Sequence, residues 1–137
     1  MQLRKNAKVE MLQRVPLFAH CSKKELAEVA ALADELQLEE GRELTREGKL
    51  GREFFVIVEG EVVVRRKGKK VATSGAGDFI GEMSLVTGRP RNATVTTTKR
   101  TRVLVVTESA FRRLLETSPS IPRKLLWALA ERIPDAT

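Results

Sequence analysis

The sequence predicts a mainly β domain flanked by helices, and two observations support this class. All nine glycines lie between Gly41 and Gly88, where short β-branched runs recur between turn residues. Outside this window, apolar residues follow a helical spacing on both flanks. We therefore expect one domain over residues 1–137: an antiparallel β-sandwich or β-barrel with N-terminal and C-terminal helices.

The composition is typical of a soluble globular protein, with 42% hydrophobic and 31% charged residues. No apolar run is long enough to span a membrane, and the N-terminus lacks the apolar core of a signal peptide. We expect a cytoplasmic protein. Cys21 is the one cysteine and His20 the one histidine, which excludes an internal disulfide and a protein-only His/Cys metal site.

The chain is basic, with a formal net charge of +7, but the cations are spread along it. Diffuse basicity predicts attraction to anions and not a recognition surface. The densest run is R-R-K-G-K-K at residues 65–70. We expect the solvated tip of a hairpin there, with contact to a polyanion as the alternative.

The N-terminal helical segment is expected over residues 1–35. A first helix has apolar residues at Leu3, Ala7 and Met11, and a break follows at residues 15–18, V-P-L-F. Residues 22–25, S-K-K-E, form a capping box in which Ser22 and Glu25 bond reciprocally. The helix that follows places one apolar face inward, comprising Leu26, Val29, Ala30 and Ala33.

The β region is expected over residues 36–106. Residues 54–64, F-F-V-I-V-E-G-E-V-V-V, consist of two β-branched runs around Glu59 and Gly60, which predicts a hairpin. Further strands are expected over residues 70–74, 91–98 and 102–106.

Two helices are expected over residues 107–137. Thr107 can cap the first helix, which carries Phe111, Leu114 and Leu115 on one face. The second runs from about Pro122 to Ile133 and is apolar nearly all round from residue 125 to 130. That excess predicts two contacts. One is with the barrel, and in the other the helix packs against a partner or acts as a moving lid. Trp127 could stack on the base of a ligand, pack on the barrel or lie in a dimer interface. The same three positions are open to Arg132 and Ile133.

The stretch from Gly81 to Gly88, G-E-M-S-L-V-T-G, predicts a short helical turn that begins after Gly81 and ends at Gly88. The unpaired amides at such a start attract an anion. Glu82, as an ionised acceptor, suits hydroxyl groups such as those of a ribose. Alternatively, the negative charge of Glu82 only stabilises the positive end of the helix dipole.

Strand parity predicts that Arg91 faces the barrel interior together with Ala93 and Val95. A buried guanidinium needs an anion. Glu82 could supply it as an internal ion pair. A bound phosphate would do so better, because the arginine fork can bind two oxygens. The residues thus leave a phosphate-plus-sugar site and an ion pair as open alternatives.

Residues 77–95, G-D-F-I-G-E-M-S-L-V-T-G-R-P-R-N-A-T-V, resemble the phosphate-binding cassette of the cyclic nucleotide-binding domain family, whose pattern is roughly F-x-G-E-[LM]-[AGS]-L and P-R-x-A-x-V. We place the cassette at residues 79–95. The rest of the chain is similar too, with the capped N-terminal helices, the central hairpin and two C-terminal helices that resemble the family's hinge and lid.

The resemblance implies specific roles within the cassette. Arg91 would pair with the cyclic phosphate, and Glu82 would accept from the ribose 2′-hydroxyl. The small Ala93 would leave room beside the phosphate, and main-chain groups around Gly81, Met83 and Ser84 would complete the cradle.

The resemblance also places the base pocket, with a wall of Val64, Val71 and Ala72 that could equally be ordinary barrel core. Asn92 directly follows the arginine, at a position where the family often discriminates between the bases of cAMP and cGMP. An asparagine there favours neither nucleotide. We favour cAMP over cGMP because the overall pattern looks bacterial. The resemblance implies that the ligand is a cyclic nucleotide, with no cofactor and no metal. It also implies that the fold is an antiparallel jelly-roll-like β-barrel (double-stranded β-helix) of eight strands.

Together these observations predict a regulatory sensor that couples ligand binding to movement of the C-terminal helices and is not an enzyme. Its partners would be a homodimer copy through the C-terminal helix, or a fused or separate effector. Because no helix-turn-helix follows, we expect no direct sequence-specific nucleic acid binding. The alternatives are a scaffold module without ligand, the sensor half of a transcription regulator that lacks its DNA-binding part, and a nucleic-acid-binding regulator, which the pI near 10 favours but for which these residues contain no reading helix.

Overall fold

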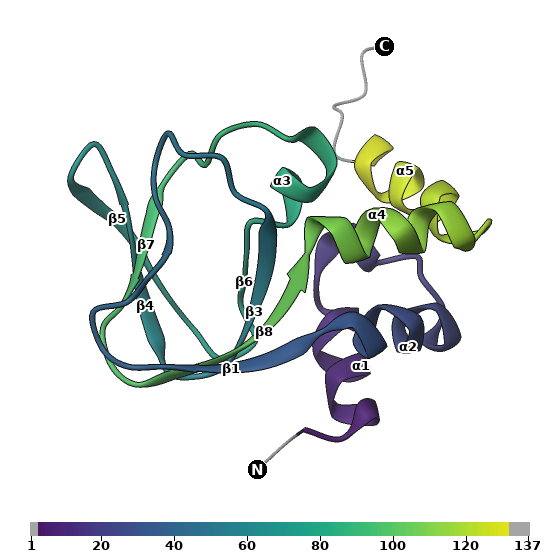
Figure 1. Cartoon of the computed structure of the whole chain (residues 1–137), viewed down its shortest axis with the longest axis horizontal. Helices are drawn as coiled ribbons and strands as arrows, with labels where there is room; N and C mark the ends of the chain where they lie inside the picture. The colour runs from purple at the N-terminus through teal and green to yellow at the C-terminus, as the bar shows by residue number, and fades with distance from the viewer. Residues whose placement is uncertain (1–2, 132–137) are drawn as a thin grey trace. The chain divides into compact units, whose positions relative to one another are not determined.

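The computed structural model of the chain describes residues 3–131 and shows two compact units (Figure 1). One unit comprises Ala33–Glu108, and the other comprises the described residues up to Leu32 and from Ser109 onward. These limits fall within a few residues of the segment limits expected from the sequence. The expected end of the last helix at Ile133, together with Arg132, lies outside the described residues.

The β unit contains eight strands within the described residues, in two antiparallel four-stranded sheets. One sheet has the order β1-β8-β3-β6 and the other β2-β7-β4-β5. The antiparallel, mainly β class is confirmed, although the sheets do not close into a barrel. The strands are β1 Asp34–Leu38, β2 Glu43–Thr45, β3 Glu53–Glu59, β4 Glu61–Arg66, β5 Lys69–Gly75, β6 Phe79–Ile80, β7 Thr94–Thr97 and β8 Thr101–Thr107.

The predicted hairpin around Glu59 and Gly60 is wrong. β3 pairs with β6 and β8, whereas β4 pairs with β5 and β7, so the chain passes from one sheet to the other at this turn. Gly60 has φ of 113°, and a side chain there would overlap Thr101. A tight corner between sheets and a hairpin have the same sequence signal, because both need glycine between two apolar strands.

The next turn does form the expected hairpin. β4 and β5 pair antiparallel, and the basic residues of the run 65–70 are all exposed.

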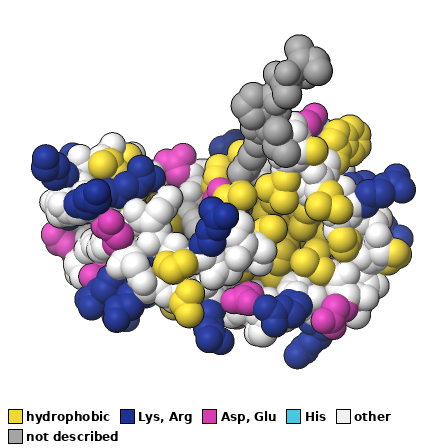
Figure 2. Space-filling view, turned by 90° about the horizontal axis from the view of Figure 1, so that it is seen from above, with side chains coloured by type: hydrophobic (Ala, Val, Ile, Leu, Met, Phe, Trp, Pro, Cys, Tyr) yellow, Lys and Arg dark blue, Asp and Glu magenta, His cyan; other side chains and the backbone are white. Residues whose placement is uncertain are grey.

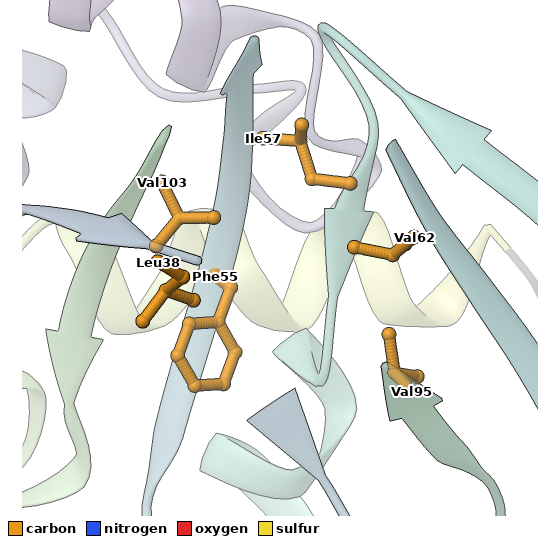
Figure 3. Close-up of a cluster of buried hydrophobic side chains, with 6 residues drawn as sticks. All are labelled: Leu38, Phe55, Ile57, Val62, Val95 and Val103. Carbon is orange, nitrogen blue, oxygen red and sulfur yellow. The ribbon is translucent and has the colours of Figure 1, made fainter. Parts of the chain in front are cut away.

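The core of the β unit lies between its two sheets (Figure 3). Leu38, Phe55, Ile57 and Val103 come from the first sheet, and Val62 and Val95 from the second. Burial of these side chains, each 9% exposed or less, provides the main favourable free energy that holds the sheets together.

The helical unit confirms the capping box. The amide of Ser22 donates to Glu25 Oε1 at 2.7 Å, and the amide of Glu25 donates to Ser22 Oγ at 3.1 Å. The apolar positions Leu26, Val29 and Ala30 that follow are buried, as predicted. The helices of this unit are α1 Lys5–Gln13, the 3₁₀ turn η1 Pro16–Phe18, α2 Lys23–Leu32, α4 Glu108–Thr117 and α5 Ile121–Ala130.

The last helix has more apolar surface than one buried face requires, as expected. α5 buries Ile121, Leu125 and Ala128 but leaves Leu126 66% and Trp127 55% exposed. The indole of Trp127 stacks on the ring of His20, with centroids 3.7 Å apart and planes 2° apart. None of the three settings weighed for Trp127 includes this stack. No helix in the described part of the chain is long and apolar enough to cross a membrane.

One buried carboxylate joins two helices of this unit. Glu25, 6% exposed, accepts hydrogen bonds from Ser120 Oγ and from Lys124 Nζ, the latter at 2.5 Å, in addition to the Ser22 amide. Burial alone would raise the pKa of Glu25. The hydrogen bonds from Lys124, Ser120 and Ser22 outweigh it and lower the pKa to about 2. The capping box thereby also anchors the start of α5.

Glu25 should make the stability of the chain depend on pH. Because its folded-state pKa of about 2 lies below the ordinary 4.5, its stabilising effect is complete above about pH 5 and is lost as the pH falls toward 2. Glu25→Gln should lower the free energy of unfolding at pH 7 by about 2 kcal/mol, the usual loss for hydrogen bonds to a charged group. Urea denaturation at pH 7 and pH 3 measures both effects. The exposed Glu28 on the same helix provides the control Glu28→Gln, and an equal loss in the two variants would contradict the role of Glu25.

Candidate functional site

The predicted helical turn is present as α3, which spans Glu82–Thr87. Gly81 precedes it in the left-handed conformation, with φ of 83°, and Gly88 ends it with φ of 67°. A side chain at Gly81 would be strained by that conformation and would also overlap the Arg91 guanidinium. The turn therefore begins and ends at glycines, as the sequence predicts, and its first residue is Glu82.

The structure confirms that Arg91 faces inward. Arg91 is 6% exposed, and Ala93, Val95 and Thr97 are also buried, whereas Asn92 is exposed. The alternation holds even though β7 begins only at Thr94. A charged side chain thus lies in the same inward row as the apolar core of the β unit.

The Arg91 guanidinium is held mainly by the main chain. Its Nη1 donates to the carbonyl of Gly81 at 3.4 Å, and its Nη2 donates to the carbonyl of Glu53. Its Nε is buried and, within residues 3–131, has no hydrogen-bond partner. Burial lowers the pKa of Arg91, and the charge of Glu53 acts in the opposite direction. The buried charge is therefore only partly compensated by the protein.

Glu53 and Gly51 are two residues of this site that the sequence did not reveal. Both lie in the segment G-R-E at residues 51–53, which leads into β3. The Arg91 side chain lies against Gly51 so closely that any Cβ there would overlap its Nε and Cζ. Of the acids, we expected only Glu82 to act on Arg91. A glycine next to an acid before a strand gives no sign that a distant arginine packs on it.

A cavity of about 550 Å³ lies in front of Arg91 and α3. Its lining includes eight of the ten residues predicted to bind ligand: Val64, Gly81, Glu82, Met83, Ser84, Arg91, Asn92 and Ala93. The cassette predicted from residues 79–95 is therefore brought together in one place.

Val71 and Ala72 do not line this cavity, and their role as a wall of the base pocket stays a prediction. Val71 is 50% exposed, because the pairing of β4 with β5 shifts register between Val64 and Arg65 and leaves Val71 without an opposite residue. Ser74, farther along β5, lines the cavity instead. A bulge of this kind cannot be located from apolar alternation alone.

The cavity is rich in positive charge. Arg66 from β4 and Arg89 from the loop after α3 line it together with Arg91, and Glu82 is the acidic residue of the lining. Three guanidinium groups around one carboxylate favour an anionic ligand. Phosphate geometry suits such a set, since arginine can donate two parallel bonds.

The fit of Arg91 over Gly51 leads to a prediction. Gly51→Ala should displace the guanidinium and lower the free energy of unfolding by about 1 to 3 kcal/mol, the usual cost of overpacking. Gly75→Ala is the matched control, because a Cβ there meets its nearest atom, the Gly60 carbonyl oxygen, at an ordinary 3.6 Å. Thermal and urea denaturation of the two variants measure the difference. Equal stability would mean that Arg91 moves aside without cost.

Comparison with known proteins adds independent information. The family model described as the cyclic nucleotide-binding domain matches residues 35–118. A cAMP-dependent protein kinase regulatory subunit of Mycosarcoma maydis is 40% identical over 118 residues, which cover 77% of this chain and 22% of that protein. A cyclic nucleotide-gated potassium channel of Rhizobium etli is 32% identical over 123 residues, which cover 90% of this chain and 34% of that protein.

Solved structures agree with these matches. The crystal structure of the N-terminal domain of a transcriptional regulator of Streptomyces coelicolor A3(2) has a TM-score of 0.80 and 33% identity, over 89% of this chain and 88% of that domain. The chain spans only 22% to 34% of the length of the two full-length relatives. The family model covers more than half of the chain, and the chain therefore belongs to the cyclic nucleotide-binding domain family.

Proposed function

We propose that the chain binds cAMP in the cavity in front of Arg91 and acts as a regulatory sensor, without turnover. The observation that carries this proposal is the buried Arg91 guanidinium, whose charge is compensated, within the part of the chain that the structure describes, by two carbonyls and the nearby Glu53. A cyclic phosphate presents two exocyclic oxygens that can accept from such a group. Its negative charge offsets the cost of keeping the guanidinium out of water.

The rest of the cavity suits the sugar and base of a nucleotide. Glu82 begins α3 beside Arg91 and would accept from the ribose 2′-hydroxyl, and main-chain groups of Gly81, Met83 and Ser84 would line the sugar and phosphate. Val64 and Ser74 line the cavity from the paired strands β4 and β5, where the base would lie. We favour cAMP over cGMP because a relative named for cAMP dependence is 40% identical.

The proposed output is a movement of α4 and α5. Binding would draw α3 toward the phosphate, and the C-terminal helices would respond to the new position of the cassette. A ligand shifts such an equilibrium only by its differential affinity for the two states, commonly about 1 to 3 kcal/mol. The exposed apolar face of α5, with Leu126 and Trp127, is available to a homodimer copy or an effector that reads this movement.

Calorimetric titration with cAMP and cGMP tests the proposal. The protein is first denatured and refolded so that any co-purified nucleotide is removed. We expect saturable one-site binding of cAMP, and weakening by about 2 to 5 kcal/mol in Arg91→Ala, the penalty for truncating one partner of a buried charge pair. Arg89→Ala is the matched control, because Arg89 lines the same cavity but is exposed.

No heat with either nucleotide would overturn the proposed function. Equal weakening by Arg89→Ala and Arg91→Ala would show that general positive charge, and not the buried guanidinium, holds the phosphate. Circular dichroism of each variant verifies that it is folded.

The role of Glu82 calls for a separate test with 2′-deoxy-cAMP. If the Glu82 carboxylate accepts from the 2′-hydroxyl, Glu82→Ala and removal of the hydroxyl should each weaken binding by about 1 to 3 kcal/mol, the worth of a hydrogen bond to a charged group. The two changes together should weaken binding by little more than either change alone, because the second change removes a hydrogen bond that is already lost. Additive losses in this cycle would place the ribose contact on another residue.

A further inference from the structure

The tip of the β4–β5 hairpin is more basic than its place in the fold requires. We define the basic ribbon as Arg65 and Arg66 of β4, the turn residue Lys67, and Lys69 and Lys70 of β5, and all five are exposed. Figure 2 shows Lys and Arg side chains gathered at the left end of the molecule, the end at which this hairpin lies in Figure 1. This run is the densest positive charge of a chain whose net charge is +7.

The pairing of the ribbon places like charges directly opposite one another. Arg65 pairs with Lys70, and Arg66 pairs with Lys69, in consecutive positions of the register. Cross-strand neighbours of this kind have Cβ atoms only about 4.5 to 5.5 Å apart, so two cations there repel and destabilise the hairpin. The carboxylate of Glu47 accepts from the Lys67 main-chain amide at 2.8 Å, which holds the turn.

Protection of a sheet edge explains only part of this charge. β5 is the edge strand of its sheet, and exposed lysines on an edge strand prevent pairing with other chains. That reason covers Lys69 and Lys70. It does not cover Arg65, because that residue is paired with Thr94 of β7 on one side and with Lys70 of β5 on the other.

The shape of the ribbon indicates what it binds. Residues 69–73 of β5 are all exposed, so neither face of that strand is buried near the tip. Since neighbours in a strand point to opposite faces, Arg65 and Lys70 lie on one face and Arg66 and Lys69 on the other. A ligand that neutralises both faces must offer negative charge on two sides. A nucleic acid duplex does so, because its major groove admits a two-stranded ribbon between two rows of phosphates.

We propose that the basic ribbon is a docking surface for double-stranded nucleic acid, bound through its phosphates without regard to sequence. A flat anionic membrane would meet one face of the ribbon, and the ribbon carries no aromatic residue to anchor in lipid. The surface is separate from the function proposed for the cavity. Only Arg66 belongs to both the ribbon and the cavity lining.

The test uses the full chain and a fluorescein-labelled DNA duplex of about two helical turns and arbitrary sequence. The ribbon variant combines Arg65→Gln, Lys67→Asn, Lys69→Gln and Lys70→Gln. Arg66 is left in place because it lines the cavity, and asparagine is chosen for Lys67, whose φ is 52°. The matched control removes four exposed cations at the starts of α1 and α2 by Arg4→Gln, Lys5→Gln, Lys23→Gln and Lys24→Gln.

Fluorescence anisotropy at several salt concentrations measures the affinity and its salt dependence. We expect the ribbon variant to bind the duplex at least ten-fold more weakly at low salt. Its slope of log K against log salt should be smaller by up to about 3.6, because four cations are removed and each phosphate contact contributes about 0.9. The control should keep most of the affinity and slope. Retained cAMP binding, or unchanged thermal unfolding if the chain binds no nucleotide, verifies the fold of the ribbon variant.

Three results would overturn the proposal. The first is an unchanged slope in the ribbon variant, and the second is an equal loss in the control, which would assign the attraction to net charge. The third is ribbon-dependent binding to phosphatidylserine vesicles or polyglutamate that is as tight as binding to the duplex. That last result would show a general polyanion contact and not one that needs phosphates on two sides.

Discussion

Burial of the Arg91 guanidinium is the constraint on which the rest of the β unit depends. A charge that leaves water must find compensation within a few ångströms, or it destabilises the fold. The protein meets this need in part, through the carbonyls of Gly81 and Glu53 and the charge of Glu53. Gly51 and Gly81 leave room for the side chain, since a Cβ on either would overlap it. Their place in the sequence is thus fixed by one arginine.

Among residues 3–131, each unit contains one buried ionised side chain, and the contrast between the two separates structure from function. Glu25 has its compensation within the helical unit, from Ser22, Ser120 and Lys124, and its pKa falls to about 2 as a result. Arg91 keeps a buried Nε without a partner among the described residues, and its pKa is lowered by burial. A fully satisfied charge anchors helices. A partly satisfied charge that borders a cavity favours a ligand of opposite sign.

Local rules predicted those parts of the fold that depend on local chemistry. The capping box at Ser22 and Glu25, the turn from Gly81 to Gly88 and the inward row that starts at Arg91 depend on residues at most a few positions apart. The family pattern then implied roles for these residues, and those roles stay predictions. Eight of the ten predicted ligand-binding residues do line one cavity.

Long-range geometry explains what the sequence could not show. At Gly60 the chain crosses to the other sheet, and a side chain there would overlap Thr101, a residue of another strand. The register shift next to Val64 removes Val71 from the apolar alternation, and it has no sequence signal of its own. Gly51 and Glu53 lie beside Arg91 because the segment that precedes β3 pairs with the segment that precedes β7: the Arg91 amide donates to the Lys49 carbonyl at 2.8 Å, and Leu50 bridges Pro90. The contacts at Gly60 and at Arg91 are thus made with residues far along the chain.

The charge of the cavity also bears on the rate at which a ligand arrives. Arg66 and Arg89 line the cavity but are exposed, so water and salt screen much of their attraction for a bound phosphate. Exposed charges of one sign at the mouth of a cavity do increase the encounter rate of an oppositely charged ligand. If the cavity binds an anion as proposed, Arg91 and these two arginines would have different effects on binding. The buried guanidinium would determine how long the anion stays, whereas the exposed ones would determine how often it arrives, and only the second effect should fall steeply as salt is added.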